Sequence, residues 1–188
     1  MNVILIGMKH CGKSTLGAAL AARWQCLFSD VDTLIEERHA CEGGGNLSVR
    51  EIFAQHGEAR FTELETAVVC DLCLRLSDAT DNHVIAGGGR TALNKKVDEL
   101  LAGLGVIVYL EGSPEEMFAR VMQTGVPAFV DQSDPAGHFQ ELYRQRDPHY
   151  RRLANLTVNV DGLDVEAALE RLCASLKEKD EGGGNLEG

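Results

Sequence analysis

The sequence predicts a three-layer α/β/α fold in which helices cover both faces of a parallel β-sheet. Apolar runs of strand length alternate with longer stretches of helical period along the chain, which is the pattern of successive β-α units. The first apolar run also leads through a glycine-bounded turn into an amphipathic helix, at residues 3–24. Both observations favour an open, parallel sheet whose ligands lie at the carboxyl ends of the strands.

The positions of the strands and helices follow from the spacing of apolar residues and from residues that start or stop helices. Apolar runs predict strands at residues 3–6, 26–28, 83–86, 106–110 and 156–160. Helical spacing predicts helices at residues 13–24, 33–38, 48–72, 94–104, 114–123, 139–146 and 165–176, with glycine-rich residues 39–46 as a loop. Ser48 and Glu51 form a capping-box pattern, Pro114 follows a capping serine, Asp164 caps the last helix, and Gly57 interrupts the longest one.

The chain of 188 residues is long enough for one domain with a substantial core. We expect that domain to span residues 1–176. Residues 125–137 have no period and several prolines, glycines and aspartates, so they are the best candidate for a mobile lid. Residues 177–188 are polar and glycine-rich, which predicts a disordered tail.

Charge and composition exclude several classes of protein. With 18 Lys and Arg against 29 Asp and Glu, the net charge of −11 argues against a nucleic-acid-binding face, which needs clustered cations. The apolar runs are too short to span a membrane, and the first strand begins too early for a signal peptide, so we expect a cytoplasmic protein. Six scattered cysteines are expected to stay reduced, and the spacing of Cys70 and Cys73 fits a buried helical face better than a metal site.

Residues 7–14 fit the pattern G-x-x-x-x-G-K-[ST] between a strand and a helix, which indicates a phosphate-binding loop, or P-loop. In such a loop, backbone N–H groups and a helix N-terminus surround the phosphates of a nucleotide. Lys13 is then expected to reach the β- and γ-phosphates, and the Ser14 hydroxyl to bind Mg²⁺. A signalling GTPase is disfavoured, because Asn94-Lys95 is followed by Val97 where the base-reading motif needs aspartate.

Three further groups are expected at the same edge of the sheet. Asp30 and Asp32 end the second strand, where one carboxylate can hold hydrated Mg²⁺ and the other can orient an acceptor hydroxyl or take its proton. Residues 87–89 are three glycines that allow close backbone approach to a ligand. Arg146, expected at a helix end, suits an anionic group of the substrate.

Together these motifs resemble the shikimate kinase family over about residues 2–172. The segments that carry the resemblance are residues 7–15, 30–36, 48–53, 57–58 with Phe61 and Glu65, 86–89, 108–111, and 146–148 with Tyr150. The resemblance implies a nucleoside-monophosphate-kinase-like fold with a five-stranded parallel sheet, a small substrate-binding region and a closing lid. It also implies ATP-dependent phosphorylation of the shikimate 3-hydroxyl, a step of aromatic amino acid biosynthesis.

The resemblance also implies roles for individual residues. Lys13, Asp32 and Asp30 take the catalytic positions, with Ser14 and Asp30 at Mg²⁺. Asp32, the turn of Gly87, Gly88 and Gly89, and Arg146 contact the acceptor. The expected nucleotide-binding residues are Gly7, Lys9, Cys11, Gly12, Lys13, Ser14, Thr15 and Arg120.

Two positions depart from the family's pattern. Thr62 stands where the family has an arginine that shares the substrate carboxylate, and Val126 stands where the lid usually carries one. We expect Arg90, directly after the glycine turn, to reach the acceptor, and Lys9 to reach the γ-phosphate. Arg60 lies two residues along the helix from Thr62 and therefore faces elsewhere.

Two alternatives remain open at this point. Thr62 is consistent with a kinase of the same fold that phosphorylates a different polyol or hydroxy acid. Val126 is consistent with an ATP-binding regulatory domain that has no activity. We expect the small-molecule acceptor and ATP to be the partners, and the protein to be a monomer.

Overall fold

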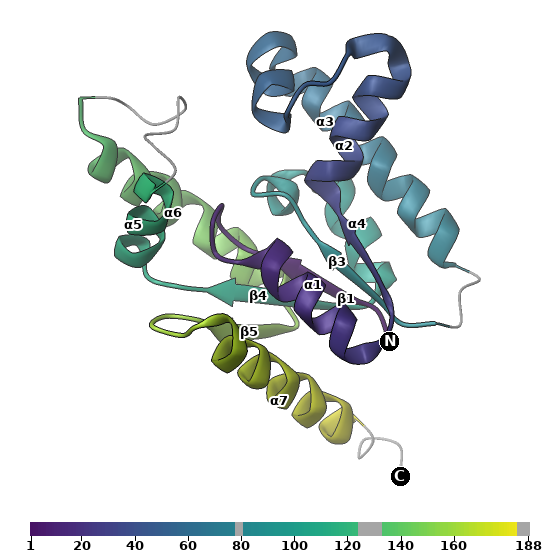
Figure 1. Ribbon diagram of the computed structural model, residues 1–188, viewed down its shortest axis with the longest axis vertical. Coiled ribbons are helices and arrows are strands. Elements are labelled where there is room, and N and C mark those ends of the chain that lie inside the picture. The colour runs from purple at the N-terminus through teal and green to yellow at the C-terminus, as the bar shows by residue number, and fades with distance from the viewer. Residues whose placement is uncertain (78–80, 124–132, 184–188) are drawn as a thin grey trace.

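The computed structural model describes residues 1–77, 81–123 and 133–183, and it has the predicted three-layer architecture (Figure 1). Its central sheet has five parallel strands in the order β2-β3-β1-β4-β5. The strands are β1 (Val3–Ile6), β2 (Leu27–Asp30), β3 (His83–Ala86), β4 (Val106–Glu111) and β5 (Leu156–Asn159). The prediction of an α/β fold with five parallel strands is therefore confirmed.

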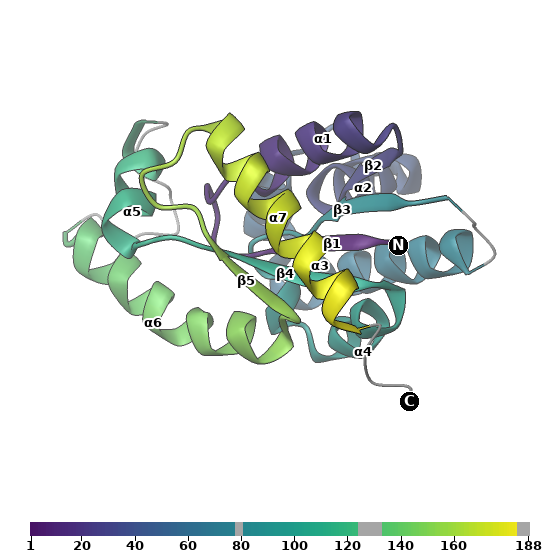
Figure 2. The ribbon, with the colours of Figure 1, turned by 90° about the horizontal axis from the view of Figure 1, so that it is seen from below.

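Helices cover both faces of the sheet (Figure 2). On one face lie α1 (Lys13–Trp24) and α7 (Val165–Gly183), which pack on each other. On the other lie α3 (Val49–Leu76), α4 (Lys95–Leu104) and α6 (Pro135–Leu153). Every residue of β1 and β3 is buried, which explains why these strands are continuous apolar runs rather than alternating ones.

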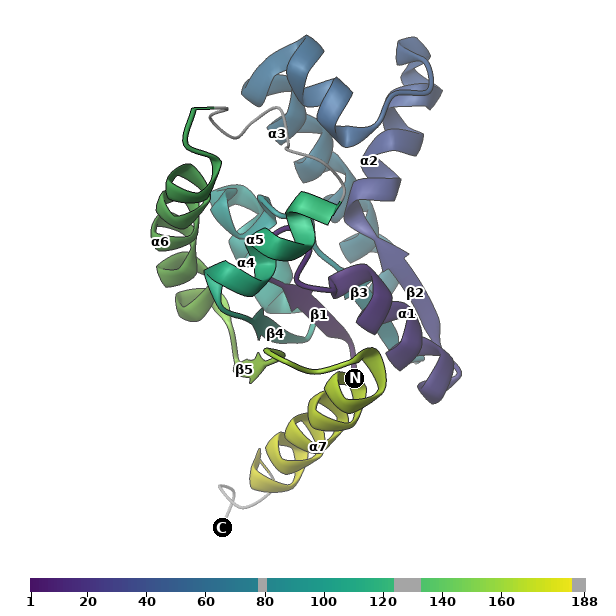
Figure 3. The ribbon, with the colours of Figure 1, turned by 60° about the vertical axis from the view of Figure 1, so that its left-hand side comes forward.

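The carboxyl edge of the sheet gathers the segments that carried the sequence motifs. The P-loop follows β1, the carboxylate pair ends β2, and the glycine turn follows β3. Asp30 and Ala86 are register partners in neighbouring strands, which brings the aspartates beside the glycine turn. Above this edge, α2 (Val31–His39) and α3 rise on one side, and α5 (Pro114–Gln123) and α6 on the other (Figure 3).

The structure corrects the ends of two elements around β2. This strand ends at Asp30, where the carboxylate pair was expected, and α2 begins at Val31 instead of residue 33 because the Asp30 side chain accepts the N–H of Asp32 at 2.9 Å. Residues 39–46 are not simply a loop: Ala40–Gly44 (η1) continue α2 as one π-helical turn. Arg38 supports that turn through an ion pair with Glu42 four residues on, at 2.8 Å.

The signals at the start and middle of α3 are confirmed. Ser48 and Glu51 form a capping box, and Gly57 leaves the helical conformation with φ 76° and ψ −178°. Cys70 and Cys73 lie on this helix as expected, but both are half-buried instead of buried. A short 3₁₀ turn at Thr91–Leu93 (η2) precedes α4, whose N-terminus Asn94 caps.

Helix α6 was predicted at residues 139–146 and is much longer. It begins at Pro135 because Asp134 caps it, accepting the N–H of Gly137 at 3.0 Å, and it continues through Pro148 to Leu153. A proline removes one hydrogen bond, but packing of the buried Tyr150 and an ion pair between Asp147 and Arg151 at 2.8 Å stabilise the helix on either side. Arg146 consequently lies inside a helix and not at its end.

The final helix also exceeds its prediction, since α7 runs through residues 177–183, which were expected in a disordered tail. Lys177 and Glu181 form an i,i+4 pair there at 3.8 Å, and residues of this type favour helix. Residues 184–188 and most of the expected lid at 125–137 lie outside the described residues; Pro135, Ala136 and Gly137 belong to α6. Within the described ranges, none of the helices is long and apolar enough to cross a membrane.

Candidate active site

The P-loop has the backbone that its glycines were expected to allow. Gly7 and Gly12 have φ values of 146° and 97°, in the region that side chains rarely adopt. A Cβ on Gly7 would lie 2.8 Å from the carbonyl oxygen of Leu110, so the loop also needs glycine there for close packing. Gly12 directly precedes α1, so the N-terminus of α1 points its free N–H groups and its positive dipole end into the loop.

Lys13 is held inside this loop. Its side chain is buried, and Nζ donates to the carbonyl oxygens of Gly7 at 3.0 Å and Met8 at 2.9 Å. Cys11 is buried beside it, with Sγ 3.8 Å from Nζ, whereas Thr15 is exposed at the start of α1. The ammonium is thus fixed among backbone dipoles at the point where a loop of this kind holds phosphate oxygens.

Ser14 and Asp30 form the second part of the site. The Ser14 hydroxyl donates to Oδ2 of Asp30 at 2.5 Å, while Oδ1 of Asp30 caps α2. Two hard oxygen ligands are therefore adjacent at the mouth of the P-loop, which fits Mg²⁺, an ion that takes few protein ligands and otherwise binds water and phosphate. Among the described residues no group of three or more His, Cys, Asp or Glu side chains could hold a metal ion, so a closed protein cage is not the alternative.

Asp32 lies against the glycine turn. A Cβ on Gly88 would come within 2.4 Å of Oδ1 of Asp32, so only glycine permits this approach. Burial raises the pKa of the Asp32 carboxyl, and Asp30 adds to the shift, while the positive charges of Lys13 and Lys9 oppose it. A raised pKa makes this carboxylate a better proton acceptor than an exposed aspartate.

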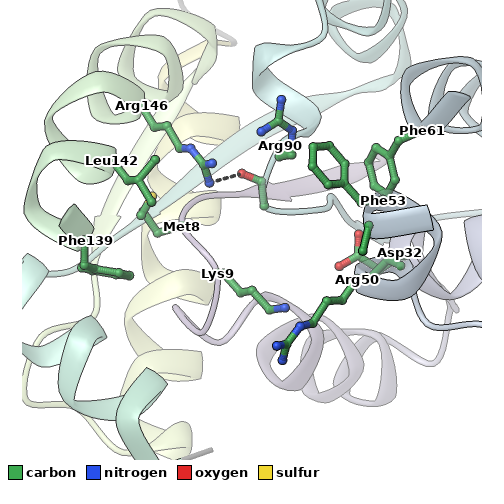
Figure 4. Close-up of a pocket in the computed structure, with 13 residues that line it drawn as sticks. Met8, Lys9, Asp32, Arg50, Phe53, Phe61, Arg90, Phe139, Leu142 and Arg146 are labelled. Atoms are coloured by element: carbon green, nitrogen blue, oxygen red, sulfur yellow. Dashed lines mark hydrogen bonds between the residues drawn. The ribbon is translucent and has the colours of Figure 1, made fainter. Parts of the chain in front are cut away.

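A cavity of about 420 Å³ lies next to Asp32 and the P-loop (Figure 4). Its polar lining consists of one acid and four cations, and its apolar lining is rich in aromatic rings. The lining residues are Met8, Lys9, Asp32, Val49, Arg50, Phe53, Ala54, Phe61, Gly89, Arg90, Phe139, Leu142 and Arg146. A pocket with apolar walls and a strong positive charge suits a small anionic molecule with a carbon ring.

Arg146 reaches this cavity from the interior of α6. Its Nη1 donates to the carbonyl oxygen of Gly89 at 3.4 Å, and the hydroxyl of Tyr150 donates to the same oxygen at 2.7 Å. Burial lowers the pKa of the Arg146 guanidinium, and the nearby charge of Arg90 lowers it further. Two neighbouring guanidinium groups that disfavour each other are stabilised by an anion between them.

Arg90 lines the cavity as expected and is held by two neighbours. It forms an ion pair with Glu58, and its guanidinium lies over the ring of Phe53, 5.0 Å from the centroid. Glu65 lies behind this cluster with only 2% of its surface exposed, and it accepts hydrogen bonds from Thr91 at 2.8 Å and Asn94 at 3.0 Å. Burial raises the pKa of Glu65, and the charge of Arg90 acts against that rise.

Thr62 and Arg60 do not line the cavity. Arg60 instead pairs with Glu42 and Glu63, in agreement with the expectation that it faces elsewhere. Arg120 lies apart, on α5, in an ion pair with Glu116, which also accepts the N–H of Gly162 at 2.9 Å. Arg120 is thereby linked through Glu116 to the loop between β5 and α7.

Sequence reasoning missed two kinds of lining residue. The aromatic residues Phe53, Phe61 and Phe139 were not expected to line a cavity, because helical period alone does not separate a core face from a cavity wall. Arg50 was also missed. Its signal is a cation in the first turn of a helix, where acidic residues are favoured.

Comparison with known proteins identifies the family. A family model described as shikimate kinase matches residues 9–177. A shikimate kinase of Pseudomonas paraeruginosa is 36% identical over 176 residues, covering 92% of this chain and 96% of the relative.

Solved structures agree with that match. The shikimate kinase of Acinetobacter baumannii in complex with shikimate superposes with a TM-score of 0.82 at 25% identity, covering 95% of this chain and 93% of that one. The shikimate kinase of Aquifex aeolicus gives a TM-score of 0.74 at 27% identity, with both chains fully covered. The chain belongs to the shikimate kinase family.

Proposed function

We propose that the protein transfers the γ-phosphoryl group of ATP to the 3-hydroxyl of shikimate. One observation carries the proposal: Asp32 lies in a cavity that has the P-loop on one side and Arg90 and Arg146 on the other. An acceptor with a hydroxyl and a carboxylate on one ring fits between these groups. Membership of the shikimate kinase family supports the choice of shikimate.

The P-loop side binds ATP in this proposal. The N–H groups from Gly7 to Thr15 surround the phosphates, and Lys13 exchanges its bonds to the Gly7 and Met8 carbonyls for phosphate oxygens. Lys9 and Cys11 belong to the same loop, Lys9 on its cavity side and Cys11 in its core. Arg120, beside the loop that contains Gly162, is placed to contact the base.

Asp32 acts on the acceptor. Its carboxylate accepts a hydrogen bond from the hydroxyl and takes the proton as the new O–P bond forms and the bond to the bridging oxygen of ADP breaks. Gly88 lets the carboxylate lie at the turn, and the backbone of Gly87 and Gly89 completes that wall of the cavity. The products are ADP and the phosphorylated acceptor.

Ser14 and Asp30 would hold Mg²⁺, because they offer adjacent oxygen ligands beside the loop. When bound there, the ion neutralises phosphate charge. Asp30 has a second role as the cap of α2, which fixes the position of Asp32 two residues later.

Arg146 and Arg90 bind the acceptor carboxylate in this proposal. Arg146 is half-buried in the wall of the cavity, and Arg90 is oriented by Glu58 and Phe53. Arg90 therefore supplies the second guanidinium that is missing at Thr62. A charge-assisted pair of this kind contributes about 1.5–3 kcal/mol for each hydrogen bond.

The test is ADP release from Mg-ATP with and without shikimate, followed in a coupled assay. We expect shikimate-dependent turnover of about 1–100 per second. A panel of other polyols and hydroxy acids serves as the comparison. Turnover on another member of the panel but not on shikimate would contradict the proposed acceptor, and ATP binding without turnover on any of them would contradict the proposed activity.

We further propose that the enzyme acts in the cytoplasm as a monomer, with ATP and its acceptor as its partners. The short apolar runs and the acidic net charge of −11 support a protein that binds neither membranes nor nucleic acids. Its mass in solution should then be that of one chain, 20.4 kDa.

A further inference from the structure

Four cations line the cavity, and Arg50 differs from Arg90 and Arg146 in having no hydrogen-bond or ion-pair partner among the described residues. Arg90 pairs with Glu58, and Arg146 donates to Gly89. Arg50 forms no hydrogen bond or ion pair with any residue in the described part of the chain, although it is an exposed side chain next to Glu51. A guanidinium that is oriented into a cavity and forms no ion pair there is suited to an anionic ligand.

The place of Arg50 in its helix is unfavourable. It is the second residue of α3, in the turn where the helix dipole disfavours a positive charge. The capping box of Ser48 and Glu51 forms around it without using its side chain. A side chain that is unfavourable for its own helix, and that makes no stabilising contact in return, is expected at functional sites.

The four cations fall into two pairs along the cavity. Figure 4 shows Arg90 and Arg146 toward one end, and Lys9 and Arg50 reaching toward one another at the other, with Asp32 beside them. The proximity of the first pair also appears in the effect of Arg90 on the pKa of Arg146. The second pair joins the P-loop to the first turn of α3, and so spans the two sides that bind nucleotide and acceptor.

We propose that Arg50 binds the phosphoryl group while it is transferred, and holds it on the product. This inference rests on the proposed function. In-line transfer places the phosphoryl group between the P-loop and the hydroxyl beside Asp32, next to Lys9 and Arg50. Its non-bridging oxygens carry negative charge throughout, so a guanidinium at this point stabilises the transition state, and it also holds the phosphate after the bond to ADP has broken.

The cavity is then matched to a doubly anionic product. The carboxylate meets Arg90 and Arg146 at one end, and the new phosphate meets Lys9 and Arg50 at the other. Arg50 should therefore affect kcat and product affinity more than it affects KM for shikimate, which carries no charge at the phosphate end.

The experiment compares R50A, R50K and a control, R75A, with the wild type. Arg75 is an exposed arginine near the far end of the same helix, outside the cavity. For R50A we expect kcat to fall about tenfold or more, with KM for shikimate within about twofold of the wild-type value. R50K should recover part of kcat, and R75A should match the wild type. The Tm of R50A should be no lower than that of the wild type, because the helix loses an unfavourable charge.

A binding measurement tests the same inference without any acceptor. R50A should weaken binding of a non-hydrolysable ATP analogue by about tenfold, while binding of ADP changes less than about twofold. If the wild-type protein fails to turn over shikimate, the effect of R50A on the affinity for the ATP analogue, compared with its effect on the affinity for ADP, still tests the role of Arg50. Failure of the proposed function can therefore be distinguished from failure of this inference. Equal effects on both nucleotides, or kcat of R50A within twofold of the wild type in an active enzyme, would overturn the inference.

Discussion

At the scale of single residues, the contact between Gly88 and Asp32 is the most restrictive in the site. G88A would place a Cβ 2.4 Å from Oδ1 of Asp32, which forces the carboxylate or the turn to move. Because misplacement of about 1 Å reduces catalysis by about 100-fold, we expect kcat/KM to fall by at least that factor. G103A is the matched control, since a Cβ on Gly103 in α4 meets nothing within 4 Å. An active G88A enzyme would show that Asp32 does not act from this position.

Burial of the Asp32 carboxylate lowers the stability of the folded protein at neutral pH, although the same carboxylate is needed for catalysis. Because burial raises its pKa in the folded state, the folded protein holds this proton more tightly than the unfolded chain does. Stability is therefore lost as pH rises through the ordinary pKa to the raised one, and the full penalty is present at neutral pH.

D32N removes that charge. We expect it to lower kcat by about 10²- to 10⁴-fold, as for loss of a general base, and to raise Tm at pH 7. The gain in Tm should vanish below about pH 4, where both states of the wild-type aspartate are protonated. A D32N protein that melts lower than the wild type at pH 7 would mean that the carboxylate is stabilised by its cationic neighbours after all.

At the scale of elements, the break in α3 lies between two parts of the helix that both line the cavity. Gly57 has φ 76° and ψ −178°, a conformation that almost only glycine adopts, and it separates Phe53 from Phe61 and Glu58 on the two parts of the helix. G57A should lower the free energy of unfolding by about 1–3 kcal/mol and raise KM for the acceptor, because a straighter helix moves these residues.

The control for G57A is G43A. Gly43 also has positive φ, at 86°, and open space around it, but it lies in η1 and outside the cavity. G43A should lose about 1 kcal/mol of stability in urea unfolding with KM unchanged. A similar rise of KM in both variants would show that instability alone, and not the shape of α3, controls acceptor binding.

The helices and strands also show how much of the fold could be predicted from the sequence. Strands, the P-loop and the caps at Ser48 and Asp164 depend on neighbouring residues, and they were predicted correctly. Helix α6 was underestimated because Pro148 reads as a stop signal, while packing of Tyr150 against the glycine turn comes from residues 61 positions away. The ends of α2 and α7 were missed for a different reason: the added residues hold i,i+4 ion pairs but few apolar side chains, so the apolar period did not mark them.

The site was predictable to the extent that its residues belong to motifs. Asp32, the glycine turn and Arg90 were placed at one cavity from their order along the chain. Arg50 was not, because no motif distinguishes a surface arginine from one that the fold turns toward a pocket. That distinction exists only once β1, β2 and α3 have been assembled.

At the scale of the whole molecule, two opposite fields act on an anionic substrate. The chain carries a net charge of −11, which repels the substrate, yet four cations and one acid line its cavity. Between 0.1 and 1 M salt the Debye length falls from about 10 Å to about 3 Å. The cavity cations lie within hydrogen-bonding reach of a bound anion, whereas most of the acidic groups lie on the distant surface and are already screened at 0.1 M.

The cavity cations, and not the net charge of the chain, should therefore determine how KM depends on salt. We expect KM for shikimate to rise about threefold or more between 0.1 and 1 M KCl, measured at saturating Mg-ATP, and to do so equally in NaCl. R90A should start from a higher KM and show a weaker dependence, because it removes part of the local charge. A KM that falls as salt is added would mean that the net charge of the chain governs binding of the acceptor. The cavity arginines would then already be neutralised by neighbouring acids, as Arg90 would be by Glu58.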